Sequence, residues 1–308
     1  MPISARGPAA LGAVTVTVTV FLAVVGGCSS GADKSGAGEG GSALLAGLGA
    51  LADEKSAKQV TYLDSAEVRK VSKGDSKRFA IVSRPGGGLL NSFGAVPWGE
   101  HLELSQIGLS VDTPETGHWE GSFDAKAITG SLKSDGYERS RRDGVDVWTD
   151  SGKSGMVFRV SEDEISYSST EGSDPLSAVS PKEGSSLADN KDYRRAANCL
   201  GDVYRADFSP LTSSDSARLA ALGQRATSAG KNTEVLCFVV KDDKTAQRLE
   251  AKLRAVVSDK SPKFDGTKVT VEKGDQPFVR AVVPDTDSQR AGRLIVGDEE
   301  LWLTVADL

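Results

Sequence analysis

The same order of predicted elements occurs twice along the chain: a strand, a helix and then an antiparallel meander. In the first half, the residue pattern predicts a strand at 118–123 and a helix at 124–134, followed by strands at 145–148, 156–160 and 165–167. Apolar and polar residues alternate in the meander strands, so we expect one face to be covered and the other to be solvated. The helix that follows the first strand can cover that face.

The second half repeats this order with different residues. A strand at 234–240 precedes a helix at 243–257, and further strands are predicted at 269–271, 278–283, 293–296 and 301–305. We therefore expect an α+β fold with two similar halves, each a strand, a helix and an antiparallel meander, in ferredoxin-like or related sheets covered by helices. The halves are expected to be residues 42–183 and 184–308.

Four more helices are predicted outside this repeated order. One begins after Asp189 or Asn190, which can cap it, and ends at Gly201. Another is expected from Ser214 or Asp215 to Gly223 or Gly230. In the first half, residues 65–71 form a weaker helical pattern. The apolar segment 42–54 is interpreted as a short helix docked on the domain, with a second membrane contact as the alternative.

The first 27 residues have one charge, Arg6, and an apolar run that ends in Val25-Gly26-Gly27-Cys28. A charged start, an apolar stretch and small residues before a cleavage point are typical of an export signal. The segment resembles the signal peptide and lipobox of bacterial lipoproteins, as in the cell envelope of actinobacteria. The alternative is an uncleaved transmembrane helix, since about 20 apolar residues can span a bilayer.

The lipoprotein resemblance implies that residues 1–27 are removed and that Cys28 carries the lipid that anchors the chain to the extracytoplasmic face of the cell membrane. Two acyl chains hold a protein at a membrane stably. Residues 28–41 would then be the lipidated cysteine and a Gly/Ser-rich tether without large apolar side chains. Such a tether is flexible and spans about 20 Å.

The chain has three cysteines. With Cys28 assigned to lipid by the resemblance, Cys199 and Cys237 remain as an even pair in an exported protein. We therefore predict a Cys199–Cys237 disulfide. The alternative is two unrelated buried thiols. A redox-active pair is not favoured, because the sequence has no C-x-x-C motif.

Few residues of the body indicate chemistry. The chain has only two histidines, His101 and His118, near Trp98 and Trp119, and their spacing matches no known set of metal ligands. We expect surface or packing roles for them. The sequence Ser228-Ala229-Gly230-Lys231 matches S-x-x-K but lacks the companion motifs, so we interpret it as a turn. We expect no cofactor and no metal.

The composition narrows the possible partners. With 26% charged and 38% hydrophobic residues, the 308-residue chain can bury a core. Its net charge is −6 and it has no basic block, so nucleic acid is not expected as a partner. The basic run Arg139, Arg141 and Arg142 is interpreted as a solvated edge strand, with contact to an anionic headgroup or wall polymer as the alternative.

These patterns favour a non-catalytic binding or structural module of the cell envelope, tethered to the membrane through Cys28. Its partner would be an envelope protein, polymer or lipid. One alternative is a carrier or sensor of an apolar ligand held between sheet and helices. Another is an enzyme with an unrecognised site, which would require a deep pocket with two close carboxylates, or both histidines beside a carboxylate.

Overall fold

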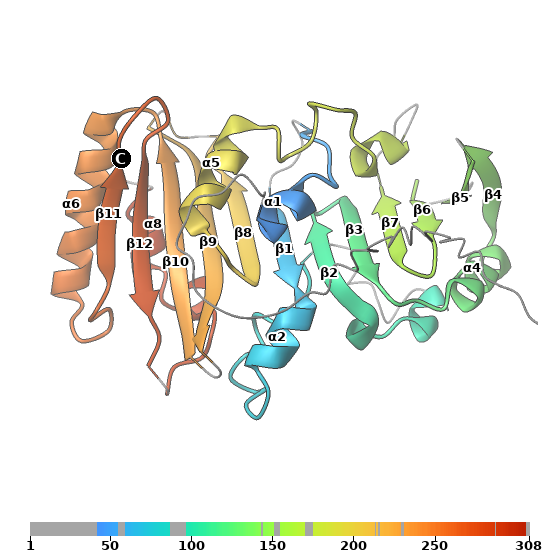
Figure 1. Cartoon of the computed structure of the whole chain (residues 1–308), viewed down its shortest axis with the longest axis horizontal. Helices are drawn as coiled ribbons and strands as arrows, with labels where there is room; N and C mark the ends of the chain where they lie inside the picture. Colours follow the sequence, from blue (N-terminus) through green and yellow to red (C-terminus); the bar gives the residue numbers. More distant parts are fainter. Residues whose placement is uncertain are drawn as a thin grey trace, which may run out of the picture. The chain divides into compact units, whose positions relative to one another are not determined.

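Twelve strands of the described chain form one antiparallel sheet (Figure 1). The computed structural model describes residues 42–54, 59–86, 97–142, 144–150, 155–169, 175–212, 214, 216–228, 231–286 and 288–305. The strands are β1 (Val60–Asp64), β2 (Ile107–Asp112), β3 (Thr116–Gly121), β4 (Tyr137–Arg142), β5 (Val145–Asp150), β6 (Val157–Val160), β7 (Glu164–Ser168), β8 (Arg205–Pro210), β9 (Ala217–Ser228), β10 (Lys231–Val240), β11 (Lys268–Glu272) and β12 (Phe278–Pro284).

The order of the strands joins the two parts of the sequence into this one sheet. It runs β11-β12-β10-β9-β8-β1-β2-β3-β7-β6-β5-β4. Strands β1 and β8 pair directly, with Thr61 opposite Asp207. The expected boundary between residues 183 and 184 falls in the connection before β8, and the sheet continues across it.

The prediction of two similar halves with separate sheets is therefore wrong, although the protein does combine helices with an antiparallel sheet. Strand, helix and meander do follow one another at β3–β7, and a strand and helix precede the β11–β12 hairpin. However, the two regions are connected by β9, β8, β1 and β2, none of which the sequence patterns identified as strands. Because these strands pair without interruption, the edges expected to separate two sheets do not exist.

Helices lie on both faces of the sheet. They are α1 (Ala43–Leu48), α2 (Ser65–Val71), α4 (Ala125–Ser134), α5 (Lys191–Leu200), α6 (Asp243–Asp259), α7 (Arg293–Val296) and α8 (Glu300–Leu303), with 3-10 turns η2 (Pro97–His101), η3 (Leu104–Gln106) and η4 (Pro175–Val179). In Figure 1, α1 and α5 lie over one face of the sheet and α8 lies behind it.

One face, here called the disulfide face, carries Tyr62, Phe208 and Cys237. These residues share a buried cluster with Leu48 of α1 and Leu200 of α5. The cap predicted for α5 is confirmed, because the Asn190 side chain accepts hydrogen bonds from the first turn and Gly201 follows with φ +72°. The predicted helix at 42–54 is present as α1, docked on the sheet with Leu44 and Leu48 buried.

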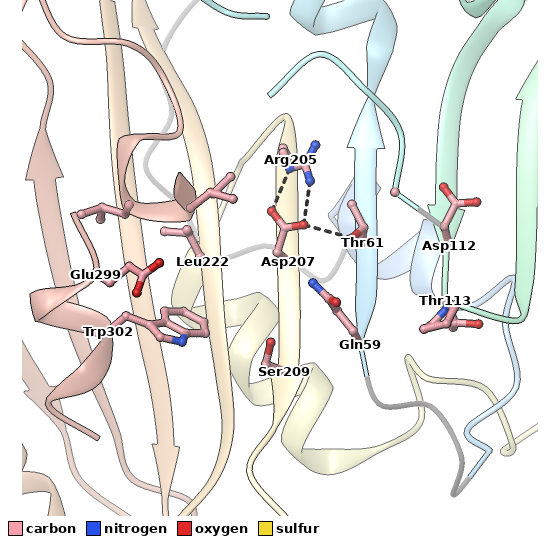
Figure 2. Close-up of a pocket in the computed structure, with 14 residues that line it drawn as sticks. Gln59, Thr61, Asp112, Thr113, Arg205, Asp207, Ser209, Leu222, Glu299 and Trp302 are labelled. Atoms are coloured by element: carbon pink, nitrogen blue, oxygen red, sulfur yellow. Dashed lines mark hydrogen bonds and ion pairs between the residues drawn. The ribbon is translucent and has the colours of Figure 1, made fainter. Parts of the chain in front are cut away.

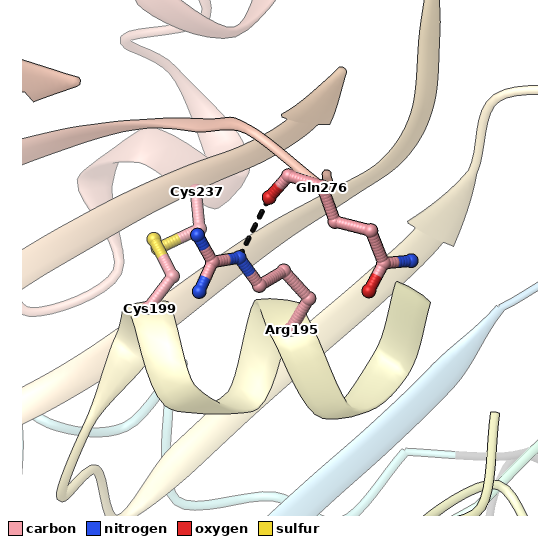
Figure 3. Close-up of a disulfide and its surroundings, with 4 residues drawn as sticks. All are labelled: Arg195, Cys199, Cys237 and Gln276. Carbon is pink, nitrogen blue, oxygen red and sulfur yellow. Dashed lines mark hydrogen bonds between the residues drawn. A yellow bond between two sulfur atoms is a disulfide. The ribbon is translucent and has the colours of Figure 1, made fainter. Parts of the chain in front are cut away.

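The predicted disulfide is also confirmed. Cys199 of α5 and Cys237 of β10 are bonded, with Cα atoms 6.1 Å apart (Figure 3). Beside the bond, Arg195 donates from Nε to the carbonyl oxygen of Gln276 at 2.7 Å and stacks over the Phe278 ring. The covalent link and these contacts hold α5 against the centre of the β9–β12 region.

The opposite face, here called the cavity face, is covered at its two ends. Toward β11, helices α6, α7 and α8 cover Leu222, Leu236 and Ala281. Toward β4, helix α4 covers Trp119, Phe158 and nearby aromatic rings. The middle of this face, at β8, β1 and β2, lies between the two helical covers.

Three of the predicted elements have the wrong type. The helix expected from Ser214 or Asp215 to Gly223 or Gly230 is absent from the described residues, because residues 217–228 form strand β9 between β8 and β10. Residues 293–296 and 301–305, expected to be strands, lie in the short helices α7 and α8 and the turn after α8. Gly292, with φ +82°, precedes α7 and turns the chain onto the cavity face.

Candidate functional site

A cavity of about 590 Å³ opens in the middle of the cavity face (Figure 2). Residues from β1, β2, β8 and β9 line it, together with residues from α7, α8 and the turn before α8. This is the part of the face that lies between the two helical covers. The site therefore depends on the strands that join the two parts of the sheet.

The sheet register explains why polar side chains meet at this place. One row of directly paired residues crosses all twelve strands, and paired residues point to the same face. We call it the central row: Val269, Ala281, Leu236, Leu222, Asp207, Thr61, Asp112, Gly117, Tyr167, Phe158, Trp148 and Arg139. Three polar residues, Asp207, Thr61 and Asp112, lie in the middle of this row. The residues on both sides of them are apolar or aromatic, except Gly117 and, at the sheet edge, Arg139.

Asp112 is the most buried charged residue of the cavity lining, with 1% of its surface exposed. Its Oδ1 accepts hydrogen bonds from Trp119 Nε1 at 2.7 Å and from the Tyr167 hydroxyl at 2.9 Å. Its Oδ2 is buried and has no hydrogen-bond partner among the described residues. Burial raises the pKa of Asp112 to about 7, although the side chains of Trp119, Tyr167 and Ser110 and the charge of Arg205 lower it.

Gly117 allows Tyr167 to reach Asp112. It pairs with Tyr167 on one side and with Asp112 on the other. A Cβ atom at Gly117 would lie 2.3 to 2.5 Å from three atoms of the Tyr167 side chain. Only a residue without a side chain lets the ring cross β3 to the carboxyl group two strands away.

Arg205 and Asp207 form a buried ion pair on β8. Nε and Nη2 of Arg205 donate to the two carboxylate oxygens of Asp207, both at 2.8 Å. The remaining Nη1 donates to the backbone carbonyl of Arg84 at 2.7 Å, and Thr61 donates to Asp207 Oδ1 at 3.0 Å. Each of the three guanidinium nitrogens therefore donates a hydrogen bond within the protein.

The side of the cavity toward α7 and α8 is mainly apolar. Leu222, Leu294, Ile295 and Trp302 line it, and Glu299 lies beside them with an exposed side chain. In Figure 2, Thr61, Asp207 and Arg205 lie between Trp302 and Glu299 on one side and Asp112 on the other. The cavity thus combines a polar floor, formed by Thr61, Asp112, Arg205 and Asp207, with an apolar wall. This combination is typical of small-molecule sites.

The residues predicted to matter lie elsewhere or outside the described part of the chain. Cys28, the signal segment 1–27 and the tether 28–41 fall outside the described residues. Cys199 and Cys237 form a buried bond on the disulfide face, away from the cavity lining. Sequence reasoning identified none of the residues that line the cavity as a candidate site residue.

The two histidines are not brought together. His101 lies in a separate hollow beside α4, with Asp124 and Lys126. His118 lies on the disulfide face, where its Nδ1 is 3.0 Å from the Ser166 hydroxyl and its ring nitrogens are 3.6 Å from Glu120 and Glu164. Since neighbours along a strand point to opposite faces, Trp119 reaches Asp112 while His118 points away from it.

The arginine run lies where the sequence predicted it. Arg139, Arg141 and Arg142 belong to β4, which is an edge strand, and all three are exposed. Arg139 pairs with Asp146 of the neighbouring strand, and Arg141 donates to the carbonyl of Gly144 at 3.2 Å. The solvated edge strand is confirmed. Ser228 and Lys231, the ends of the S-x-x-K match, pair across the turn from β9 to β10.

The charged pattern of β8 is the signal that could have indicated the site. Arg205 and Asp207 alternate with the apolar residues Ala206 and Phe208, and all four residues are buried. Charged residues at alternate positions of a buried strand must find partners or face a cavity. This pattern was missed because the strand itself was not recognised.

No protein-family model, no curated protein and no solved structure matches the chain. Among the residues that the structure describes, no three His, Cys, Asp or Glu side chains are grouped as they would be around a metal ion. None of the helices in the described ranges is long and apolar enough to cross a membrane.

Proposed function

We propose that this protein is a lipid-anchored binding protein of the cell envelope that takes up a small molecule in the cavity at the middle of its sheet. The observation that carries this proposal is the cavity itself, with its polar floor on β1, β2 and β8. A volume of about 590 Å³ is in the range of small-molecule sites. The mixed lining favours a ligand with both polar and apolar groups over a wholly apolar one.

The destabilising effect of Asp112 in the polar floor supports a functional role for this residue. A buried carboxyl group with a raised pKa and an unpartnered oxygen destabilises a fold, and an apolar residue at position 112 would avoid that cost. Proteins bury a carboxyl group without a full set of partners mainly at functional sites. We infer that Asp112 is retained because it serves a ligand.

We propose binding without catalysis. Of the described residues that line the cavity, none is a histidine or a cysteine. Three of these described residues are acidic: Asp112, Asp207 and the exposed Glu299. Arg205 and Thr61 hold Asp207, and Trp119 and Tyr167 hold Asp112. A general acid or base needs a partner that orients it toward a reacting group, and these partners hold the carboxyl groups in the floor.

The binding proposal is tested by closing the cavity. Ser209 lines it from β8 and is half-buried, so Ser209→Trp places an indole inside and Ser209→Ala is the matched control. Purified protein is dialysed against small molecules extracted from the producing cell's envelope, and retained compounds are identified by mass spectrometry. We expect wild type and Ser209→Ala to retain an unaltered compound that Ser209→Trp loses. Equal retention by all three proteins, or none by any, would contradict the proposal.

The anchor is tested separately. We propose that Cys28 carries the lipid, so Cys28→Ala should move the protein from the membrane fraction to the soluble fraction and should lack the mass of a diacylglyceryl group. Processed wild-type protein should carry that mass on Cys28. A Cys28→Ala variant that remains membrane-bound and uncleaved would instead indicate a transmembrane helix.

A further inference from the structure

The charges of the cavity lining do not balance. Among the described residues that line the cavity, four are charged: Asp112, Arg205, Asp207 and Glu299. Arg205 is the only cation among them within the described chain, and its charge is paired with Asp207 while its Nη1 donates to the carbonyl of Arg84. Asp112 and Glu299 therefore remain without a cationic partner in the lining.

Asp112 has an acceptor to offer. Its Oδ1 is already bound by Trp119 and Tyr167, whereas its Oδ2 has no partner among the described residues. A buried carboxylate with an unused oxygen is stabilised by a donor that also carries a positive charge, because such hydrogen bonds are about twice as strong as neutral ones. An anionic group at this place would meet a second negative charge or require a shared proton.

The wall opposite Asp112 provides an apolar surface that can bury the uncharged part of a ligand. Leu222, Leu294 and Ile295 would bury an apolar body, and the indole of Trp302 can stack on a ring or attract a cation. Exposed Glu299 beside them adds negative potential that attracts cations. The acidic and apolar parts thus lie on opposite sides of one cavity (Figure 2).

We infer that the cavity binds an amphiphilic organic cation: a protonated amine that carries an aromatic or aliphatic body, with the ammonium group at Asp112 and the body against Trp302. This inference rests on the proposed function and adds the chemical class of the ligand. It excludes carboxylates and phosphates as preferred ligands.

The test uses three probes of nearly equal shape: 2-phenylethylammonium, 2-phenylethanol and phenylacetate, titrated calorimetrically into the whole protein at pH 7.5. We expect the ammonium to bind about tenfold or more tightly than the alcohol, and phenylacetate to bind weakest. Phenylacetate or the alcohol binding as tightly as the ammonium would overturn the inference.

Variants that remove one negative charge show which residue causes the preference for the ammonium probe. Asp112→Asn keeps an oxygen for Trp119 and Tyr167 but removes the charge, so it should lower ammonium affinity about tenfold and change alcohol affinity much less. Glu299→Gln, on an exposed side chain, should weaken ammonium binding less. Glu250→Gln on α6, outside the cavity lining, is the matched control and should change nothing. An equal loss for all three probes would contradict the assigned role of Asp112.

Wild-type protein gives a second measurement that does not depend on how variants fold. The groups that surround Asp112 are Trp119 and Tyr167, buried Ser110 on β2, Thr61 on β1, and the Arg205–Asp207 pair on β8. The pKa of the buried Tyr167 is raised well above its usual value, so Tyr167 stays neutral near pH 7. Ammonium affinity should therefore rise between pH 6 and 8 as Asp112 ionises, while alcohol affinity stays flat. A flat ammonium profile would contradict the inference.

These outcomes separate the two proposals. If Ser209→Trp abolishes retention of the natural compound while the three probes bind without preference, the binding function stands and the cationic ligand is wrong. If Ser209→Trp retains that compound as wild type does, the binding function itself is wrong.

Discussion

The protonation of Asp112 makes the stability of the fold depend on pH. Burial raises its pKa to about 7, whereas an aspartate in an unfolded chain has a pKa of about 3.9. The folded state therefore binds this proton more tightly than the unfolded state. The ionisation of Asp112 costs nothing below pH 4, destabilises the fold increasingly between pH 4 and 7, and reaches its full cost above pH 7.

Asp112→Asn should remove this dependence. We expect the free energy of unfolding of the variant, relative to wild type, to increase by roughly 2–4 kcal/mol between pH 4 and 8. Urea unfolding followed by tryptophan fluorescence, with the disulfide intact, measures both proteins at each pH. A difference that does not change with pH would mean that Asp112 is ionised in the fold at low pH.

Gly117 leads to a second prediction about a single residue. Gly117→Ala places a methyl group against the Tyr167 ring, which must move away from Asp112, so we expect a loss of about 1–3 kcal/mol. Gly130 is the control, because a Cβ there meets nothing within 4 Å and alanine in helix α4 should stabilise by about 0.5–1 kcal/mol. Thermal unfolding should give changes of opposite sign, and equal effects would contradict the close contact.

Among the elements, α8 distinguishes the structure from the sequence expectation most clearly. A strand over 301–305 would point Leu301 and Leu303 to the same face. In helix α8, Leu301 is fully buried in the cluster beneath α6, and Leu303 is 54% exposed. We therefore expect Leu301→Ala to cost about 2–5 kcal/mol and Leu303→Ala less than about 0.5 kcal/mol. Equal losses in urea unfolding would favour the strand.

The elements that sequence patterns predicted correctly are those with strong local signals. Helix α5 has a cap residue and a stop glycine, and α6 has apolar residues at helical spacing. The central strands lack such signals. Strand β9 contains Leu219-Ala220-Ala221-Leu222, a run of good helix formers that is buried on both faces, so tertiary pairing overrides its local preference.

At the scale of the whole molecule, the same four strands determine both the topology and the site. Strands β9, β8, β1 and β2 join the sheet, and residues on each of them line the cavity. The meeting of Asp112, Thr61 and Asp207 depends on register between segments up to 146 residues apart. Sequence alone cannot give that register, whereas the Cys199–Cys237 bond followed from simple pairing of the remaining cysteines.

The indole N–H resonances of the tryptophans test the central claim, that a ligand occupies the mid-sheet cavity. Trp302 lines the cavity, Trp119 donates to Asp112, and Trp148 lies near the far edge of the sheet, on β5. On titration with the compound retained in dialysis, followed by ¹⁵N-edited NMR, the Trp302 and Trp119 signals should shift while Trp148 stays in place. If the compound binds while Trp302 and Trp119 remain unmoved, or if Trp148 alone shifts, the cavity is not the binding site.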